Sequence, residues 1–166
     1  WCNARITVRG RDATPTDAPT DPVAVVRAFL AALERLDVDG ALELTSPDIV
    51  YQNVPLPPAR GRKAFEQQIR FLERYCTGFE AEIHHVAADG ASVLTERTDA
   101  LERGALRAAF WVDGTFEVVD GRITVWRDRF DWATVVVAVL AAVPRAIFSR
   151  LGGATPARLA MCSANP

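Results

Sequence analysis

The first part of the chain has helical periodicity and then one segment with strand periodicity. Asp21 and Pro22 are typical of the N-cap and first residue of a helix, and apolar residues follow at helical spacing. A short second helix is predicted at about residues 40–44, ended by the sequence TSPD. From Ile49 to Val54 alternate side chains share a face, which predicts a strand that ends at the rigid sequence VPLPP. The apolar residues at helical spacing in the first predicted helix are Val23, Val26, Leu30 and Leu33.

Helical spacing returns over residues 62–76, with an apolar stripe, and strand patterns fill the chain from there to residue 130. Two Asp-Gly pairs and a weaker Arg-Gly pair predict tight turns between antiparallel strands. Gly114 lies inside one of these strands and predicts a bulge that helps the sheet to curl. The helical stripe comprises Phe65, Ile69, Leu72 and Cys76, and the strands lie at about 79–87, 92–102, 106–118 and 122–130.

The order of these elements predicts the fold class. Helices come first, one strand and a helix follow, and an antiparallel meander ends the pattern. This order predicts an α+β fold in which helices pack on one side of a curved, mixed or antiparallel sheet. Such a sheet forms a cone with an apolar interior, and that interior is the expected place for a binding site.

The length of 166 residues fits one domain, predicted here at residues 21–151. Residues 1–20 and 152–166 are polar or small without apolar periodicity, which predicts a flexible N-terminal arm and a flexible C-terminal tail. The apolar run at 133–143 is too short for a membrane span, for which about 20 residues are needed. It is predicted to be a helix capped by Asp131 that closes the cavity or contacts a second subunit.

Charge and cysteine content exclude several classes of function. The formal net charge is −2, so there is no basic surplus for binding nucleic acid. Three widely spaced cysteines without a C-x-x-C pair indicate a reducing compartment, predicted to be the cytoplasm, and predict no metal site. The first residues lack the apolar stretch of a signal peptide, although the chain begins with Trp rather than Met.

Five polar side chains lie on strand faces that are otherwise apolar. Period 2 places Tyr51 with Asn53 on one strand face and Arg97 with Asp99 on another. Asp128 lies between Trp126 and Phe130 on a third face. If these faces share one cavity, the five polar residues form one group inside it. One interpretation is a buried ion-pair network that fixes strand register. The other is an acid and a base held at fixed separation by an arginine fork, which can donate to two carboxylates at once.

Three strings carry a family resemblance: YQN at 51–53, LTERTDAL at 94–101 and GRITVWRDRFD at 121–131. Together they resemble the limonene-1,2-epoxide hydrolase family, closest to its actinobacterial members, within the NTF2-like, SnoaL-like and ketosteroid-isomerase-like cone folds. The resemblance covers roughly residues 22–132. It implies a cofactor-independent, one-step hydrolysis of an apolar epoxide to a vicinal diol, carried out by a soluble homodimer without a metal.

The resemblance also implies a role for each inward-facing polar residue. Asp128 is similar to the base that takes a proton from water, and Tyr51 and Asn53 are similar to the residues that hold that water. Asp99 would protonate the epoxide oxygen, and Arg97 would bridge the two carboxylates. The expected substrate-binding walls are Leu101, Phe110, Val112, Trp126, Phe130, Phe71, Leu72 and Cys76.

Two alternatives stay open at the level of sequence. The first is a ketosteroid-isomerase-like or polyketide-cyclase-like enzyme, in which one Asp abstracts a proton from a ketone-bearing substrate. That chemistry has no evident need for an arginine flanked by two carboxylates. The second is a non-catalytic binding or dimerisation module of the same fold, in which the polar residues only stabilise the cavity.

Overall fold

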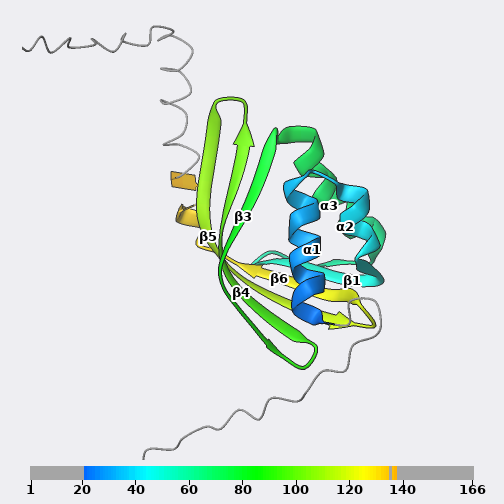
Figure 1. The fold of residues 1–166 in the computed structure, drawn as a ribbon. Helices are drawn as coiled ribbons and strands as arrows, with labels where there is room; N and C mark the ends of the chain where they lie inside the picture. The colour runs from blue at the N-terminus through cyan, green and yellow to red at the C-terminus, as the bar shows by residue number, and fades with distance from the viewer. Residues whose placement is uncertain (1–20, 135, 138–166) are drawn as a thin grey trace, which may run out of the picture.

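The computed structural model describes residues 21–134, 136 and 137, and it confirms the predicted α+β class (Figure 1). Up to residue 129, three helices and six strands lie in the order expected from the sequence, with one additional short strand, β2. The elements are α1 (Pro22–Glu34), α2 (Val38–Glu43), β1 (Thr45–Val54), β2 (Ala59–Arg60), α3 (Arg62–Tyr75), β3 (Gly78–Asp89), β4 (Ser92–Arg103), β5 (Leu106–Val119) and β6 (Arg122–Arg129).

The strands form one mixed sheet with the order β2-β1-β6-β5-β4-β3. Only β1 and β6 are parallel, and every other neighbouring pair is antiparallel. The sheet bends strongly, and α1, α2 and α3 lie on its concave side (Figure 1). Side chains that point to this side are therefore enclosed between sheet and helices, as the cone prediction requires.

Local sequence signals account for the ends of these elements. Asp21 caps α1 by accepting a hydrogen bond from the Val23 amide at 3.2 Å. Asp120 and Gly121 have φ of 50° and 70°, the left-handed conformation that a two-residue hairpin needs. The strand bounds agree with the sequence prediction to within two residues, apart from the start of β1.

The second helix begins at Val38, within two residues of the predicted start, because Asp37 caps it through the Gly40 amide at 2.9 Å, and it ends before TSPD as predicted. Two local predictions are wrong. The first strand begins at Thr45 rather than Ile49, since the buried Thr45 already pairs with Ile123 of β6. Gly114 is not a bulge, because the pairing of β5 is regular there on both sides.

An aromatic cluster packs the helices against the floor of the cone. The Phe29 ring of α1 lies 5.0 Å from Trp126 and 6.4 Å from both Phe65 and Phe116, measured between ring centroids. Trp126 also stacks on Phe116 at 5.9 Å and lies 4.5 Å from Tyr51. Aromatic pairs at these distances are stabilising beyond their buried area. They fix the rings of Tyr51 and Trp126, both of which face the cavity described below.

The residues after β6 begin a helix. Asp131 accepts hydrogen bonds from the Ala133 amide and the Thr134 hydroxyl, both at 2.9 Å, which confirms its predicted capping role. The predicted arm, the predicted tail and most of the apolar run lie outside the described residues. No helix in the part of the chain described here is long and apolar enough to cross a membrane.

Candidate active site

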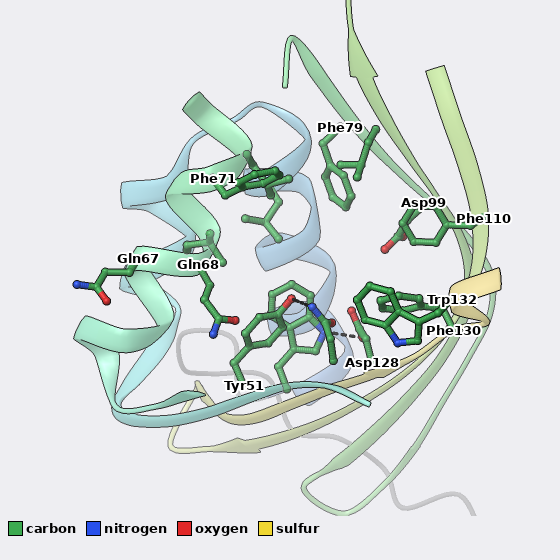
Figure 2. Close-up of a pocket in the computed structure, with 16 residues that line it drawn as sticks. Tyr51, Gln67, Gln68, Phe71, Phe79, Asp99, Phe110, Asp128, Phe130 and Trp132 are labelled. Carbon is green, nitrogen blue, oxygen red and sulfur yellow. Dashed lines mark hydrogen bonds between the residues drawn. The ribbon is translucent and has the colours of Figure 1, made fainter. Parts of the chain in front are cut away.

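A cavity of about 640 Å³ opens between α3 and the concave face of the sheet (Figure 2). Its walls are mainly aromatic and aliphatic, with a few polar groups that converge from different strands, which is typical of a small-molecule site. The lining residues are Leu33, Tyr51, Asn53, Gln67, Gln68, Ile69, Phe71, Leu72, Phe79, Asp99, Leu101, Phe110, Trp126, Asp128, Phe130 and Trp132.

Strand register brings the predicted polar residues together. The parallel pairing of β1 with β6 places Asn53 beside Asp128 and Tyr51 beside Trp126. On the other side of β6, strand β5 separates Asp128 from β4, which carries Arg97 and Asp99. A connection between the Asp99 and Asp128 carboxylates therefore requires a third side chain that reaches across β5.

Arg97 makes that connection. Its Nε donates to Asp99 Oδ1 at 2.8 Å and its Nη2 to Asp99 Oδ2 at 3.1 Å. The same Nη2 donates to Asp128 Oδ2 at 2.6 Å, and Nη1 donates to Thr95 Oγ1 at 3.1 Å. The guanidinium is fully buried and does not line the cavity, whereas both carboxylates do. Arg97 therefore holds the two carboxylates from behind at a fixed separation.

Gly114 provides the space for this reach across β5. It pairs with Thr95 of β4 and with Asp128 of β6, so it lies directly beneath the Arg97 side chain. A Cβ at this position would lie 2.5 Å from Thr95 Oγ1 and 3.1 Å from Asp128 Oδ1, and it would overlap Arg97 Nη1. Glycine is required here by close packing and not by backbone conformation.

Burial and neighbouring charges together raise the pKa values of Asp99, Asp128 and Arg97. Burial raises the pKa of Asp99 to about 6 although Arg97 opposes the shift, and the nearby Asp128 raises it further. Burial also raises the pKa of Asp128, against the effects of Arg97 and the Trp126 indole. Burial disfavours the Arg97 cation, but the two carboxylates outweigh it and raise its pKa. One cation lies beside two carboxylates whose ionisation is disfavoured by burial. This arrangement favours a site in which the two carboxylates share one proton.

Tyr51 and Asn53 form a polar pair next to Asp128. Asn53 Nδ2 donates to Tyr51 Oη at 2.8 Å, so the tyrosine hydrogen is directed to a different acceptor. Burial is the main cause that raises the pKa of Tyr51, which keeps the phenol protonated as a donor. The pair can therefore offer one O–H donor and one amide oxygen acceptor to a small molecule beside Asp128.

The structure brings most of the predicted walls to the cavity, with two exceptions. Leu101, Phe110, Trp126, Phe130, Phe71 and Leu72 line it. Val112 does not, because it is only 1% exposed and lies opposite the buried Arg97 in the β4–β5 pairing. Cys76 does not, because the helix has ended there and its backbone is extended. Those two predictions are wrong.

Several residues of the site, or the contacts that they make, were not predicted from the sequence. Trp126 was expected only as a wall, but its Nε1 also donates to Asp128 Oδ1 at 2.7 Å. Thr95 precedes Arg97 by two residues, so period 2 places it on the same face and marks it as a possible partner. Gln67 and Gln68 carry no sequence signal of this kind; the Gln68 amide points toward Tyr51 (Figure 2). The remaining additions are Leu33, Ile69, Phe79 and Trp132.

Comparison with known proteins identifies relatives of this chain. A sequence model of the limonene-1,2-epoxide hydrolase catalytic domain matches residues 20–141. The epoxide hydrolase EphG of Mycobacterium tuberculosis is 51% identical over 106 residues, which span 64% of this chain and 70% of that protein.

Solved structures agree with this assignment. The structure of a Mycobacterium tuberculosis LEH-like epoxide hydrolase is 43% identical, has a TM-score of 0.72, and is matched over 78% of this chain and 97% of its own. A structure from Shewanella denitrificans described as a "putative SnoaL-like polyketide cyclase" has a TM-score of 0.66 at 15% identity, over 74% of this chain and 98% of its own, and shows the fold alone. The chain belongs to the limonene-1,2-epoxide hydrolase family and is an epoxide hydrolase.

Proposed function

We propose that the chain adds water to an apolar epoxide in one step, with Asp128 as general base and Asp99 as general acid, to give a vicinal diol. The observation that carries this proposal is that one buried guanidinium binds both carboxylates while both line one apolar cavity. A strained oxirane is already a reactive electrophile. An aligned acid and base can therefore each contribute on the order of 10²- to 10⁴-fold.

The attacking water would lie between Asp128, Tyr51 and Asn53. It would donate one hydrogen to the Asp128 carboxylate and the other to the Asn53 amide oxygen, and accept a hydrogen bond from the Tyr51 hydroxyl. This arrangement leaves one lone pair of the water oxygen for the oxirane carbon. Positioning of this kind removes much of the entropic cost of the reaction.

Asp99 would hold the proton before each turnover. Arg97 donates twice to Asp99 and once to Asp128, and the Trp126 indole supplies a second donor to Asp128. Hydrogen bonds to the charged form favour ionisation, and each carboxylate therefore receives two of them. The ionised form is assigned to Asp128 because the family resemblance implies that this residue is the base. Both groups have raised pKa values, so the pair retains a proton to higher pH than free carboxylic acids do.

The proposed step balances without a further reactant. Asp128 takes a proton from water as the water oxygen bonds to one oxirane carbon. The carbon–oxygen bond of the ring breaks, and its electron pair takes the proton of Asp99. The step leaves a diol, protonated Asp128 and ionised Asp99. Arg97 bridges both carboxylates, so the proton returns to Asp99 along that bridge or through solvent when the diol leaves.

Single-turnover hydrolysis of limonene oxide or styrene oxide in ¹⁸O-water tests this step. The label is expected in the diol during the first turnover, since no enzyme oxygen enters the product. Unlabelled diol in that turnover would indicate a covalent enzyme ester instead. Asp99→Asn and Asp128→Asn are expected to abolish turnover in folded protein, while Asp113→Asn, an exposed acid on β5, should retain it. Full activity in either site variant would remove that residue from its role.

We also propose a homodimer, which the family resemblance implies, located in the cytoplasm, which the widely spaced cysteines indicate. The large exposed side chains Leu94 and Trp111 lie on the convex face of the sheet and support a protein contact there. Light scattering coupled to size exclusion is expected to give twice the mass of the chain. A monomer at micromolar concentration would contradict the dimer, and recovery of the native protein from a membrane fraction would contradict the location.

A further inference from the structure

The Arg97 guanidinium has one hydrogen-bond partner that is neither a carboxylate nor part of the cavity wall. Its Nη1 donates to Thr95 Oγ1 at 3.1 Å, whereas its Nε and Nη2 donate to Asp99 and Asp128. Thr95 is only 4% exposed and does not line the cavity. Among the residues that the structure describes, no other group accepts a hydrogen bond from Nη1. Thr95 therefore contacts the site only through Arg97.

The packing around Thr95 holds its hydroxyl beside Nη1. Thr95 lies opposite Gly114 in the β4–β5 pairing, and a Cβ on that glycine would lie 2.5 Å from Thr95 Oγ1. The fully buried Phe116 ring lies 5.9 Å from the guanidinium carbon of Arg97. A threonine side chain is β-branched and has few χ1 rotamers in a strand, which restricts the direction of its hydroxyl oxygen. The hydroxyl is therefore a rigid, neutral acceptor for one corner of the guanidinium.

The proposed hydrolysis moves a negative charge from one side of Arg97 to the other. Asp128 begins ionised and ends protonated, while Asp99 begins protonated and ends ionised. Coulomb attraction therefore draws the Arg97 cation toward Asp128 before the reaction and toward Asp99 after it. The Thr95 hydroxyl is uncharged in both states, so its hydrogen bond to Nη1 opposes a displacement of the cation throughout the turnover.

We propose that Thr95 is a positioning residue, which holds the Arg97 guanidinium in one place while the charge moves from Asp128 to Asp99. Thr95 touches neither the epoxide nor the attacking water, and it acts on the reaction only through Arg97. A fixed cation keeps both carboxylates aligned, as a single step that uses an acid and a base together requires. The inference rests on the proposed function and adds one residue to the proposed site.

Thr95→Val tests the inference, because valine has nearly the same shape and cannot accept a hydrogen bond. A misplacement of about 1 Å costs on the order of 10²-fold in rate, and the loss of one hydrogen bond of several permits a smaller one, so kcat on limonene oxide should fall about tenfold. KM should stay within about twofold, since Thr95 does not line the cavity. Thr95→Ser keeps the hydroxyl and should recover most of kcat.

Thr98→Val is the matched control. Thr98 lies on the same strand but on the convex face, where its hydroxyl lies 2.8 Å from His84 Nε2. This variant also loses a threonine hydroxyl with one hydrogen bond, and it should keep the kcat of the wild type.

A titration without substrate provides a second readout. Burial raises the pKa values of Asp99 and Asp128, and Arg97 opposes that rise. A guanidinium that is held less firmly should oppose it less, so the apparent pKa values of the pair are expected to be higher in Thr95→Val than in the wild type or Thr98→Val. ¹³C-carboxyl NMR measures them. A threonine that only satisfies a buried N–H group would change the free energy of unfolding in urea and leave this titration unmoved.

The outcomes distinguish this inference from the proposed function. In Thr95→Val, a wild-type kcat, or a titration that is unmoved or shifted to lower pH, would overturn the role of Thr95, as would a Thr95→Ser enzyme equally slow. If Thr95→Val does not fold, Thr95→Cys takes its place, since its sulfur is only a weak acceptor, and the same changes are expected. An absence of diol from every epoxide would overturn the proposed function, while the titration would still show whether Thr95 holds Arg97.

Discussion

Replacing Gly114 by alanine is expected to displace the Arg97 guanidinium from its position behind the two carboxylates. The new Cβ would lie 2.5 Å from Thr95 Oγ1 and would overlap Arg97 Nη1, and ordinary van der Waals contact begins at 3.4 Å. The threonine oxygen alone would have to recede by about 0.9 Å, the difference between those two distances. Arg97 has little freedom to follow, because Asp99 and Asp128 hold its other nitrogens.

The size of the effect follows from that displacement. In the proposed mechanism Arg97 positions the two carboxylates, and a misplacement of about 1 Å at a reacting site costs on the order of 10²-fold in rate, so kcat should fall by roughly that factor. Overpacking a buried site costs about 1–3 kcal/mol of unfolding free energy. Gly114 lies in regular extended strand, so no further backbone penalty is expected.

The assay combines kcat on limonene oxide with unfolding in urea. Gly90→Ala is the matched control, since Gly90 occupies a left-handed hairpin position with φ of 58° and open space around it. It should lose about 1 kcal/mol of stability and keep its kcat. Adding Thr95→Ala to Gly114→Ala should restore part of the activity by removing one of the clashing atoms. A Gly114→Ala enzyme with kcat within twofold of the wild type would refute the reasoning.

Three further predictions concern the charges of the site. Trp126→Phe removes the indole donor to Asp128, so the pKa of that carboxylate should rise and the acidic limb of the kcat/KM profile should move to higher pH; an unmoved limb would contradict the assigned base. The proposed acid role requires a protonated Asp99, and its raised pKa is about 6, so kcat/KM should decline as pH rises through that region; a profile that climbs steadily to pH 9 would contradict the proposed acid. Arg97→Met leaves two buried carboxylates without a cation and should cost about 3–5 kcal/mol in urea unfolding at pH 8. Its native carboxylates hold protons that the unfolded chain releases, so the loss should shrink toward pH 4, and a loss equal at both pH values would contradict that explanation.

Strand periodicity identified the five inward-facing polar residues of the strands, but not Gln67 and Gln68 of α3. A side chain two positions from a buried neighbour shares its face, and this rule alone placed Arg97 with Asp99 and Tyr51 with Asn53 on inward faces. The rule does not say which strands become neighbours. The order of β4, β5 and β6 in the sheet decides that Arg97 reaches Asp128, and that order depends on contacts distant in sequence.

The sequence predictions that failed concern how deeply a side chain is buried, where a helix ends, or which side chain packs on a residue. The Val112 side chain points to the expected face of β5, but other side chains cover it. Cys76 fits the helical stripe but follows the last helical residue. Gly114 has the same sequence signal whether it causes a bulge or makes room for a side chain. Only the position of the Arg97 guanidinium distinguishes these two uses of glycine.

The placement of Arg97 bears on whether the buried charges are only structural. A buried arginine with two carboxylates is costly, and apolar residues of similar volume often stabilise a protein as well or better. A purely structural network would favour carboxylates covered on all sides. Here Asp99 and Asp128 are 5% and 3% exposed, and both face a cavity of about 640 Å³ while the cation lies behind them (Figure 2). The fold thus buries these charges at a cost in stability and directs both carboxylates toward the space where an epoxide would bind. This arrangement favours acid–base chemistry over a purely structural role.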